Sequence, residues 1–251
     1  MSKYLLILDA GHSKDTKGKK AFDNSFYEWD FNNKMQYLLK TRAEAHGITV
    51  KLTNPSPGTV SDISLTTRAN TANNFYKSLN IPKTIMISLH ANAYGSDFNS
   101  ARGVEVYHAS NASNNSKNLA KYICDNIYSD VKAIDTGFKN RGVKCQDFTV
   151  IYKTITPTCL VEYAFYSNKD DLKILKNNQN ELVEATLKGI CKYFNINYQA
   201  PKKETVKTDS TASNTYYRVV AGSYTNRTNA DKLVSDLKSK GYPAFVDIYK
   251  K

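Results

Sequence analysis

Four residues of this sequence have side chains that bind metals or transfer protons, and their positions suggest one site. His12, His90 and Glu162 each follow an apolar segment, and Glu28 stands at the expected start of a helix. A carboxylate directly after an apolar segment is costly unless it is solvated, paired or bound to a metal. Two histidines and a carboxylate are a common ligand set for catalytic zinc, and a further carboxylate can transfer protons. The set predicts a candidate metallohydrolase.

Each of these residues also has a simpler interpretation. A single loop histidine is most often hydrogen-bonded to the backbone. An acidic residue in a first helical turn, such as Glu28, complements the helix dipole without any catalytic role. The residue types by themselves leave both interpretations open.

The elements that must position these residues alternate between strands and helices. Apolar segments predict strands, and apolar residues at helical spacing predict helices. The alternation is typical of an α/β fold with a twisted, mostly parallel sheet flanked by helices. His12, His90 and Glu162 would then lie at the carboxyl ends of strands, where ligands bind in open sheets. The expected strands are 4–9, 48–53, 84–89, 103–108 and 158–162, and the expected helices are 27–46, 65–79, 116–131 and one or two within 170–194.

A second, smaller unit follows the first. Residues 199–215 contain one branched aliphatic residue and no aromatic residue, which is typical of a solvated linker. The tail predicts a small βαβ unit, with strands at 217–224 and 243–249 around a helix at 229–240. Such a unit is too small to bury much core alone. We therefore predict domains at 1–198 and 216–251, joined by a linker at 199–215.

Composition narrows the classes of partner and location. The 35 Lys and Arg residues exceed the 23 Asp and Glu residues, giving a net charge of +12. This favours a polyanionic partner, namely nucleic acid, an anionic membrane or a wall with anionic polymers. No nucleic-acid-binding motif is present, so nucleic acid is not expected. The N-terminus lacks a signal-peptide pattern, so we expect synthesis in the cytoplasm without a signal peptide and action at the bacterial wall after release.

Spaced motifs along residues 4–195 resemble, in order, those of the zinc-dependent N-acetylmuramoyl-L-alanine amidases. The resemblance implies that His12, Glu28 and His90 bind one Zn²⁺ per chain and that Glu162 is catalytic. Ser13 stands where the family usually has a glycine after the histidine. The motifs are Ile7-Leu8-Asp9-Ala10-Gly11-His12, Glu28, Arg68-Ala69-Asn70, Ser88-Leu89-His90-Ala91-Asn92-Ala93, Gly103-Val104-Glu105-Val106-Tyr107, Leu160-Val161-Glu162 and Phe165-Tyr166-Ser167-Asn168.

The reaction implied by the resemblance is hydrolysis of the amide bond between N-acetylmuramic acid and L-alanine in peptidoglycan. Zinc would lower the pKa of a bound water to about 7 and polarise the carbonyl. Glu162 would take a proton from that water and return it to the leaving amine, and a role as fourth zinc ligand is the alternative. Arg68, Asn92 and Arg141 are further candidates for substrate binding, and each also has an ordinary explanation as a surface, turn or salt-bridge residue.

The tail resembles about half of a SPOR-type peptidoglycan-binding domain, through Tyr217–Tyr224, Asn229-Ala230-Asp231 and Lys240-Gly241-Tyr242. The missing half suggests a homodimer in which two chains complete the unit. A tethered wall binder would raise the concentration of the enzyme at its insoluble substrate. The functions considered are a phage endolysin, a bacterial autolysin of the same activity, and a non-catalytic peptidoglycan-binding protein.

Overall fold

The computed structural model describes residues 2–14, 16–55, 62–201, 221–239 and 244–248. The chain divides into two compact units, Met1–Pro201 and Lys202–Lys251. Most of the predicted linker, residues 202–215, lies outside the described residues.

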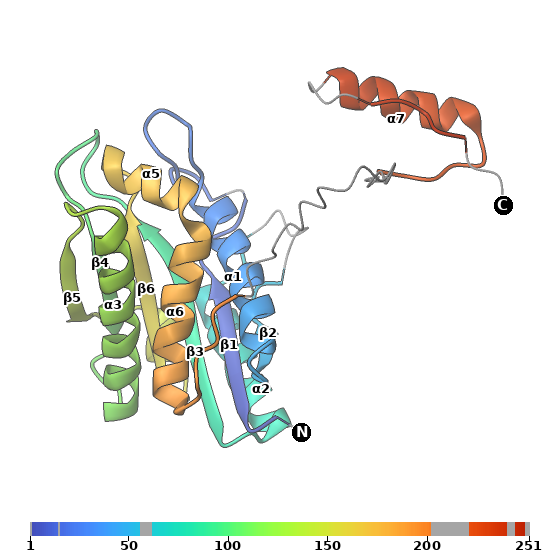
Figure 1. Cartoon of the computed structure of the whole chain (residues 1–251). Coiled ribbons are helices and arrows are strands. Elements are labelled where there is room, and N and C mark those ends of the chain that lie inside the picture. Colours follow the sequence, from blue (N-terminus) through green and yellow to red (C-terminus); the bar gives the residue numbers. More distant parts are fainter. Residues whose placement is uncertain (1, 15, 56–61, 202–220, 240–243, 249–251) are drawn as a thin grey trace, which may run out of the picture. The chain divides into compact units, whose positions relative to one another are not determined.

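The first unit is built on a sheet whose described strands have the order β2-β1-β3-β6-β4-β5 (Figure 1). Each adjacent pair is parallel except β4 and β6, which are antiparallel. The predicted α/β fold with a mostly parallel sheet is confirmed. The strands are β1 (Tyr4–Ala10), β2 (Thr49–Leu52), β3 (Lys83–Asn92), β4 (Val104–His108), β5 (Asn140–Cys145) and β6 (Thr158–Phe165).

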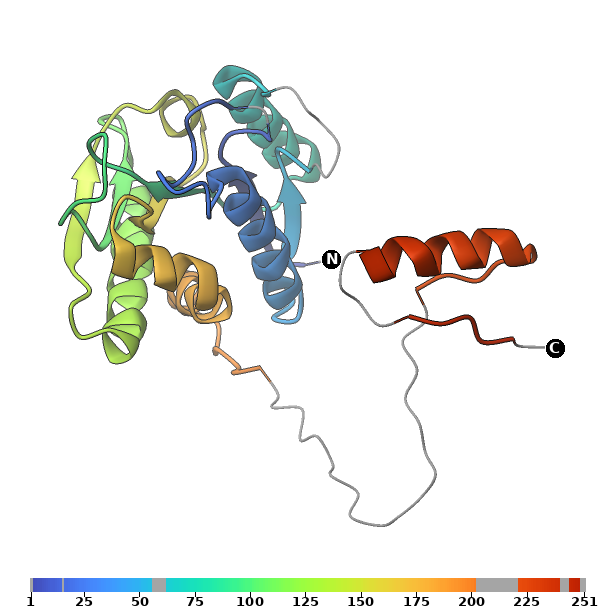
Figure 2. The same ribbon diagram turned by 90° about the horizontal axis from the view of Figure 1, so that it is seen from above.

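Helices cover both faces of this sheet (Figures 1 and 2). Leu6 and Leu8 of β1 belong to a core that also contains residues of α1, α3 and α6, whereas Leu5 and Ile7 pack with residues of α2 and α4. Successive side chains of a strand point to opposite faces, so a strand covered on both faces is apolar throughout. The helices of this unit are α1 (Glu28–Glu44), α2 (Leu65–Leu79), α3 (Asn114–Ile134), α4 (Thr149–Tyr152), α5 (Lys169–Asn177) and α6 (Gln179–Phe194).

Two elements of the first unit were not predicted from the sequence. Strand β5 has the sequence Asn-Arg-Gly-Val-Lys-Cys, and its residues alternate between exposed and half-buried. It is an edge strand held by pairing with β4, so it lacks the apolar run that marks a central strand. Helix α4 has four residues, which is too short for a helical period to appear.

In the second unit, α7 (Arg227–Ser239) is the one regular element among the described residues 221–239 and 244–248. The strands predicted at 217–224 and 243–249 lie partly outside the described residues, and their described parts are not strands. Helix α7 has no buried residue, so the described part of this unit offers little core against which a sheet could pack. No described helix of either unit is long and apolar enough to cross a membrane.

Candidate metal centre

His12, Glu28 and His90 come together at one end of the sheet. Each offers one ligand atom, and these atoms lie within 4.8 Å of one another. Glu28 Oε1 is 3.2 Å from His12 Nε2 and 3.1 Å from His90 Nδ1. The two imidazole rings meet edge to face, with their centroids 5.1 Å apart. The structure therefore places all three predicted ligands in a single cluster.

Each member of the cluster comes from a different element. His12 lies two residues after the end of β1, His90 belongs to β3, which pairs with β1, and Glu28 is the first residue of α1. His12 has a φ of +65°, a left-handed conformation that costs a non-glycine residue about 1–2 kcal/mol. The Glu28 carboxylate accepts a hydrogen bond from the backbone N–H of Ala91 at 3.3 Å. The carboxylate thus faces the histidines and the end of β3.

Protonation in the cluster suits metal binding. Burial would raise the pKa of Glu28, but its hydrogen bonds with His12 and His90 outweigh burial and hold the pKa well below its ordinary value. Burial lowers the pKa of His90, against the opposing effect of Glu28. A carboxylate that stays ionised and an imidazole that stays neutral are the forms that ligate metals. Two imidazole nitrogens and one carboxylate oxygen are a donor set that fits zinc and leaves a coordination position for substrate or water.

Glu162 lies beside this cluster on β6. It is the register partner of His90 on β3 and of Glu105 on β4. Its Oε2 atom is buried and has no hydrogen-bond partner among the described residues. Burial, reinforced by the negative charges of Glu28 and Glu105, raises the pKa of Glu162 well above its ordinary value. A carboxyl group with a raised pKa and an unengaged oxygen is suited to exchanging protons with a bound molecule.

A cavity of about 410 Å³ joins these residues. Its walls combine the predicted metal ligands, Glu162 and two cations, Lys19 and Arg68, with apolar side chains. A concave site with a few convergent polar groups is the usual form of a small-molecule or substrate site. The lining residues include His12, Lys19, Glu28, Asp62, Arg68, His90, Asn92, Phe148, Val150, Glu162 and Tyr166.

The three candidates for substrate binding have partners within the protein. Arg68 is 2% exposed, and its Nη1 atom donates to Asp9 at 3.1 Å. Asn92 is half-buried and donates to Glu105 at 2.6 Å. Arg141 also donates to Glu105, at 2.6 Å, and its guanidinium stacks on the Phe165 ring, 4.8 Å from the centroid. Arg68 and Asn92 line the cavity, and their roles and that of Arg141 stay predictions.

Sequence reasoning missed four buried polar residues around the cluster. Asp9 accepts hydrogen bonds from Arg68, Ser88 and Thr53, and Glu105 accepts from four side chains. Asp9 follows an apolar run within β1 as Glu162 does within β6, so the same signal could have identified it. Glu105 lies in an alternating strand, and Asn32 and Asn54 lie in polar segments, so no local pattern distinguishes these three.

The chain is similar to known proteins over both units. Residues 6–192 match the model of the family described as N-acetylmuramoyl-L-alanine amidase, and residues 197–250 match that of the SPOR domain. The chain is 32% identical to the endolysin of Bacillus phage SPP1 over 216 residues, which cover 81% of this chain and 72% of that protein. It is 25% identical to the N-acetylmuramoyl-L-alanine amidase CwlM of Bacillus licheniformis over 245 residues, covering 96% of this chain and 83% of the relative.

Solved structures agree with this assignment. The N-acetylmuramoyl-L-alanine amidase of Clostridium difficile 630 superposes with a TM-score of 0.67 at 27% identity, over 78% of this chain and 98% of that chain. The family match covers the whole sheet and its flanking helices, including the cluster of His12, Glu28 and His90. The chain therefore belongs to the N-acetylmuramoyl-L-alanine amidase family of peptidoglycan hydrolases and carries a C-terminal SPOR domain.

Proposed function

We propose that this amidase is a phage endolysin that binds one zinc ion through His12, Glu28 and His90. The convergence of three ligand atoms within 4.8 Å is the observation that carries the metal assignment. The similarity to the endolysin of a Bacillus phage supports the phage role. A bacterial autolysin is the second candidate, because the similarity to the Bacillus licheniformis amidase extends over 96% of the chain.

In the reaction, the amide bond between the lactyl group of N-acetylmuramic acid and L-alanine is broken by water. When bound, zinc would activate the attacking water and polarise the scissile carbonyl. Glu162 accepts a proton as the water oxygen bonds to the carbonyl carbon, and it returns the proton to the nitrogen as the C–N bond breaks. The products are a carboxylate on the sugar and a free amino group on L-alanine. The buried, unengaged Oε2 atom of Glu162 supports this role.

Substrate binding is assigned to Arg68, Asn92 and Arg141. Asn92 and Arg141 both contact Glu105, and Lys144 is a second cation on the same carboxylate. Two cations on one carboxylate leave an excess positive charge, and the side chains of Arg141 and Lys144 are each 36% exposed. An excess cation at the surface suits the carboxylates of a wall peptide. Arg68 reaches the cavity wall from α2.

The C-terminal unit binds peptidoglycan and pairs with that of a second chain. Its match to the SPOR domain and the division of the chain after Pro201 support separate domains at 1–198 and 216–251, joined at 199–215. Phe245 and Ile248 are 82% and 68% exposed, and exposed apolar side chains of this kind support contact with a second chain. Sedimentation equilibrium of the full chain should show a dimer. If the full chain is a strict monomer and still co-sediments with cell walls, the pairing is excluded.

Incubation of the pure protein with cell walls, with and without a chelator, tests the function. New L-alanine amino termini without new reducing sugars, lost on chelation and restored by Zn²⁺, are the expected result. New reducing sugars would indicate cleavage of the glycan instead. Activity that survives complete removal of metal would exclude the zinc site. The phage role is tested by deleting the gene, which should delay lysis of infected cultures, whereas loss of an autolysin should leave daughter cells joined.

A further inference from the structure

The segment 10–12 ends in a residue whose backbone conformation is unfavourable for its type. His12 has a φ of +65°, and no glycine follows it, since residue 13 is serine. A left-handed conformation at a non-glycine residue persists only where the surroundings hold it in place. The groups that hold this segment therefore decide where the imidazole of His12 lies.

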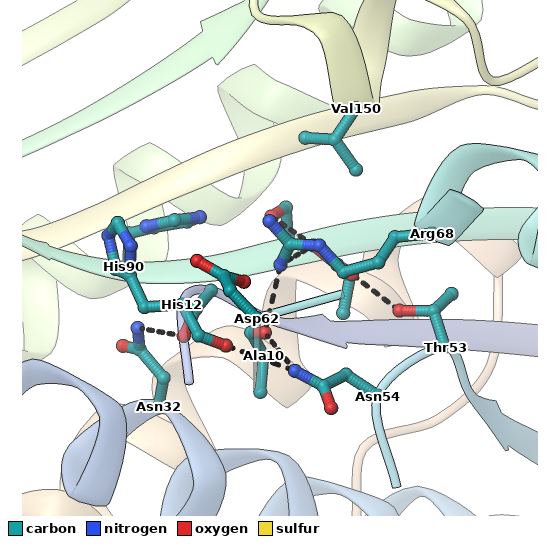
Figure 3. A network of polar contacts seen from close by, with 12 residues as sticks. Ala10, His12, Asn32, Thr53, Asn54, Asp62, Arg68, His90 and Val150 are labelled. Atoms are coloured by element: carbon teal, nitrogen blue, oxygen red, sulfur yellow. Dashed lines mark hydrogen bonds and ion pairs between the residues drawn. The ribbon is translucent and has the colours of Figure 1, made fainter. Parts of the chain in front are cut away.

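Side chains from three other elements bind the carbonyl groups of this segment (Figure 3). Asn54, in the loop after β2, donates from Nδ2 to the carbonyl oxygens of Ala10 at 3.3 Å and His12 at 3.1 Å. Asn32 of α1 donates from Nδ2 to the carbonyl of Gly11 at 3.2 Å. Arg68 of α2 donates from Nη1 to the carbonyl of Ala10 at 3.0 Å. Each of the three consecutive carbonyls is thus held by a side chain distant in sequence.

The two asparagines are engaged through their amide nitrogens. Asn32 and Asn54 are 0% and 1% exposed, and their Oδ1 atoms have no partner among the described residues. A buried polar atom without a partner destabilises a fold, so an apolar side chain of similar size would serve packing better. An apolar residue could not donate the hydrogen bonds that the amide nitrogens make to the backbone of residues 10–12.

Arg68 is fixed independently of the segment that it binds. Its guanidinium pairs with Asp9 of β1, and Asp9 also accepts a hydrogen bond from Ser88 of β3 at 2.7 Å. The charge of Arg68 is therefore neutralised at the sheet, and its contact with Ala10 ties the segment to β1 and β3. Figure 3 shows Arg68, Asn32 and Asn54 converging on the residues that precede and include His12.

We propose that Asn54, with Asn32 and Arg68, is a positioning residue that holds His12 in its left-handed conformation and so directs its Nε2 atom at the metal position. This inference rests on the proposed metal site. Asn54 supports it most clearly, because the described hydrogen bonds of its side chain go to backbone carbonyls and to none of the proposed ligand side chains. Without the amide of Asn54, residue 12 relaxes to a common backbone conformation and its imidazole leaves the cluster.

The test compares Asn54→Asp with Asn168→Asp in the full chain. Aspartate keeps the size of asparagine, but its ionised carboxylate cannot donate to a carbonyl. Asn168 is a matched control, since it is also buried and donates from Nδ2 to a loop carbonyl, that of Asn99 at 2.8 Å. None of its described side-chain hydrogen bonds involves a residue of the cluster. Two quantities are measured on metal-free protein: the Kd for Zn²⁺, by competition with a chromophoric chelator, and the free energy of unfolding in urea.

N54D should raise the Zn²⁺ Kd by about 10- to 100-fold, the usual effect of removing a residue that orients a ligand. N168D should leave the Kd within about twofold of the parent, even where it lowers the free energy of unfolding. An unchanged Kd in N54D, or an equal loss in both variants, overturns the inference. If N54D does not fold, Asn54→Ala replaces it, because alanine removes the donor without adding a charge. This variant must also raise the Zn²⁺ Kd, and an unchanged Kd in N54A overturns the inference. A parent chain that binds no Zn²⁺ would instead exclude the proposed metal site.

Discussion

The imidazole of His90 occupies the space that a side chain on Gly11 would need. A Cβ atom on residue 11 would meet Cε1 of His90 at 2.0 Å and Nε2 at 2.4 Å. Heavy atoms that are not bonded do not approach so closely, so any larger residue at position 11 must displace the ring. Glycine is thus required at position 11 for steric reasons, because the His90 ring of β3 packs directly against the backbone that follows β1.

Gly11→Ala should therefore weaken zinc binding. The displaced His90 ring no longer points its ligand atom at the cluster, and we expect the Zn²⁺ Kd to rise by at least about tenfold. Gly47→Ala is the control. Gly47 has a φ of +74°, and a Cβ atom there would meet no atom of the described residues within 4 Å, so alanine strains the backbone without crowding a ligand. That variant should lose about 1 kcal/mol of unfolding free energy and bind zinc normally. Equal zinc affinities in both variants would contradict the assignment of His90.

Glu162→Gln should abolish most of the activity and retain the metal. Glutamine has the same shape but cannot take up a proton, and loss of a general acid–base group lowers kcat by about 10²–10⁴-fold. Release of L-alanine amino termini measures the activity, and elemental analysis measures the zinc content. Glu181→Gln, on an exposed residue of α6, is the matched control and should change neither quantity. Full activity in E162Q would show that another group moves the proton, and loss of zinc would favour a ligand role.

Glu105 should contribute to stability at neutral pH and not in acid. Burial would raise its pKa, but hydrogen bonds from Lys144, Tyr107 and Arg141 outweigh burial and lower the pKa below its ordinary value of 4.5. The unfolded chain then binds the proton more tightly than the folded chain, so the contribution is complete above about pH 4.5 and is lost as the pH falls below it.

Urea unfolding of the parent and Glu105→Gln at several pH values measures this effect. At pH 7 the variant should be less stable by about 2 kcal/mol, the usual contribution of hydrogen bonds to a buried charged group. The difference should shrink as the pH is lowered from 4.5 towards 3. A difference that stays constant over this range would mean that the charge of Glu105 does not stabilise the fold.

Zinc itself should stabilise the first unit. A ligand that binds the folded chain alone, present at 100 times its Kd, raises the free energy of unfolding by about 2.7 kcal/mol. Thermal and urea unfolding with and without chelator should show this difference in the parent chain. His90→Ala should not respond to zinc, because it lacks one of the three ligands. A zinc effect of the same size in that variant would place the metal elsewhere.

The sequence allowed the fold and part of the site to be predicted, for identifiable reasons. Buried central strands are apolar throughout, and a sheet gathers their ends, so the proximity of His12, His90 and Glu162 was predictable from strand positions. Glu28 could not be separated from an ordinary first-turn acid, because its partners lie 16 and 62 residues away, at His12 and His90. The contacts of Asn54 with residues 10 and 12 depend on the conformation of the loop after β2, which the local sequence does not predict.

The place of β6 has a consequence for the order in which the enzyme becomes active. β6 is the last strand of this sheet in sequence order, yet it lies between β3 and β4, which are synthesised before it. Until residues 158–165 insert, the edges of β3 and β4 stay open. The contacts that then close them join residues distant in sequence, such as Met86 with Thr158 and Glu105 with Glu162, and such contacts slow folding. Glu162 arrives with this strand. Incompletely folded chains therefore lack the carboxylate to which we assign proton transfer, and under that proposal a chain cleaves no wall until its sheet is complete.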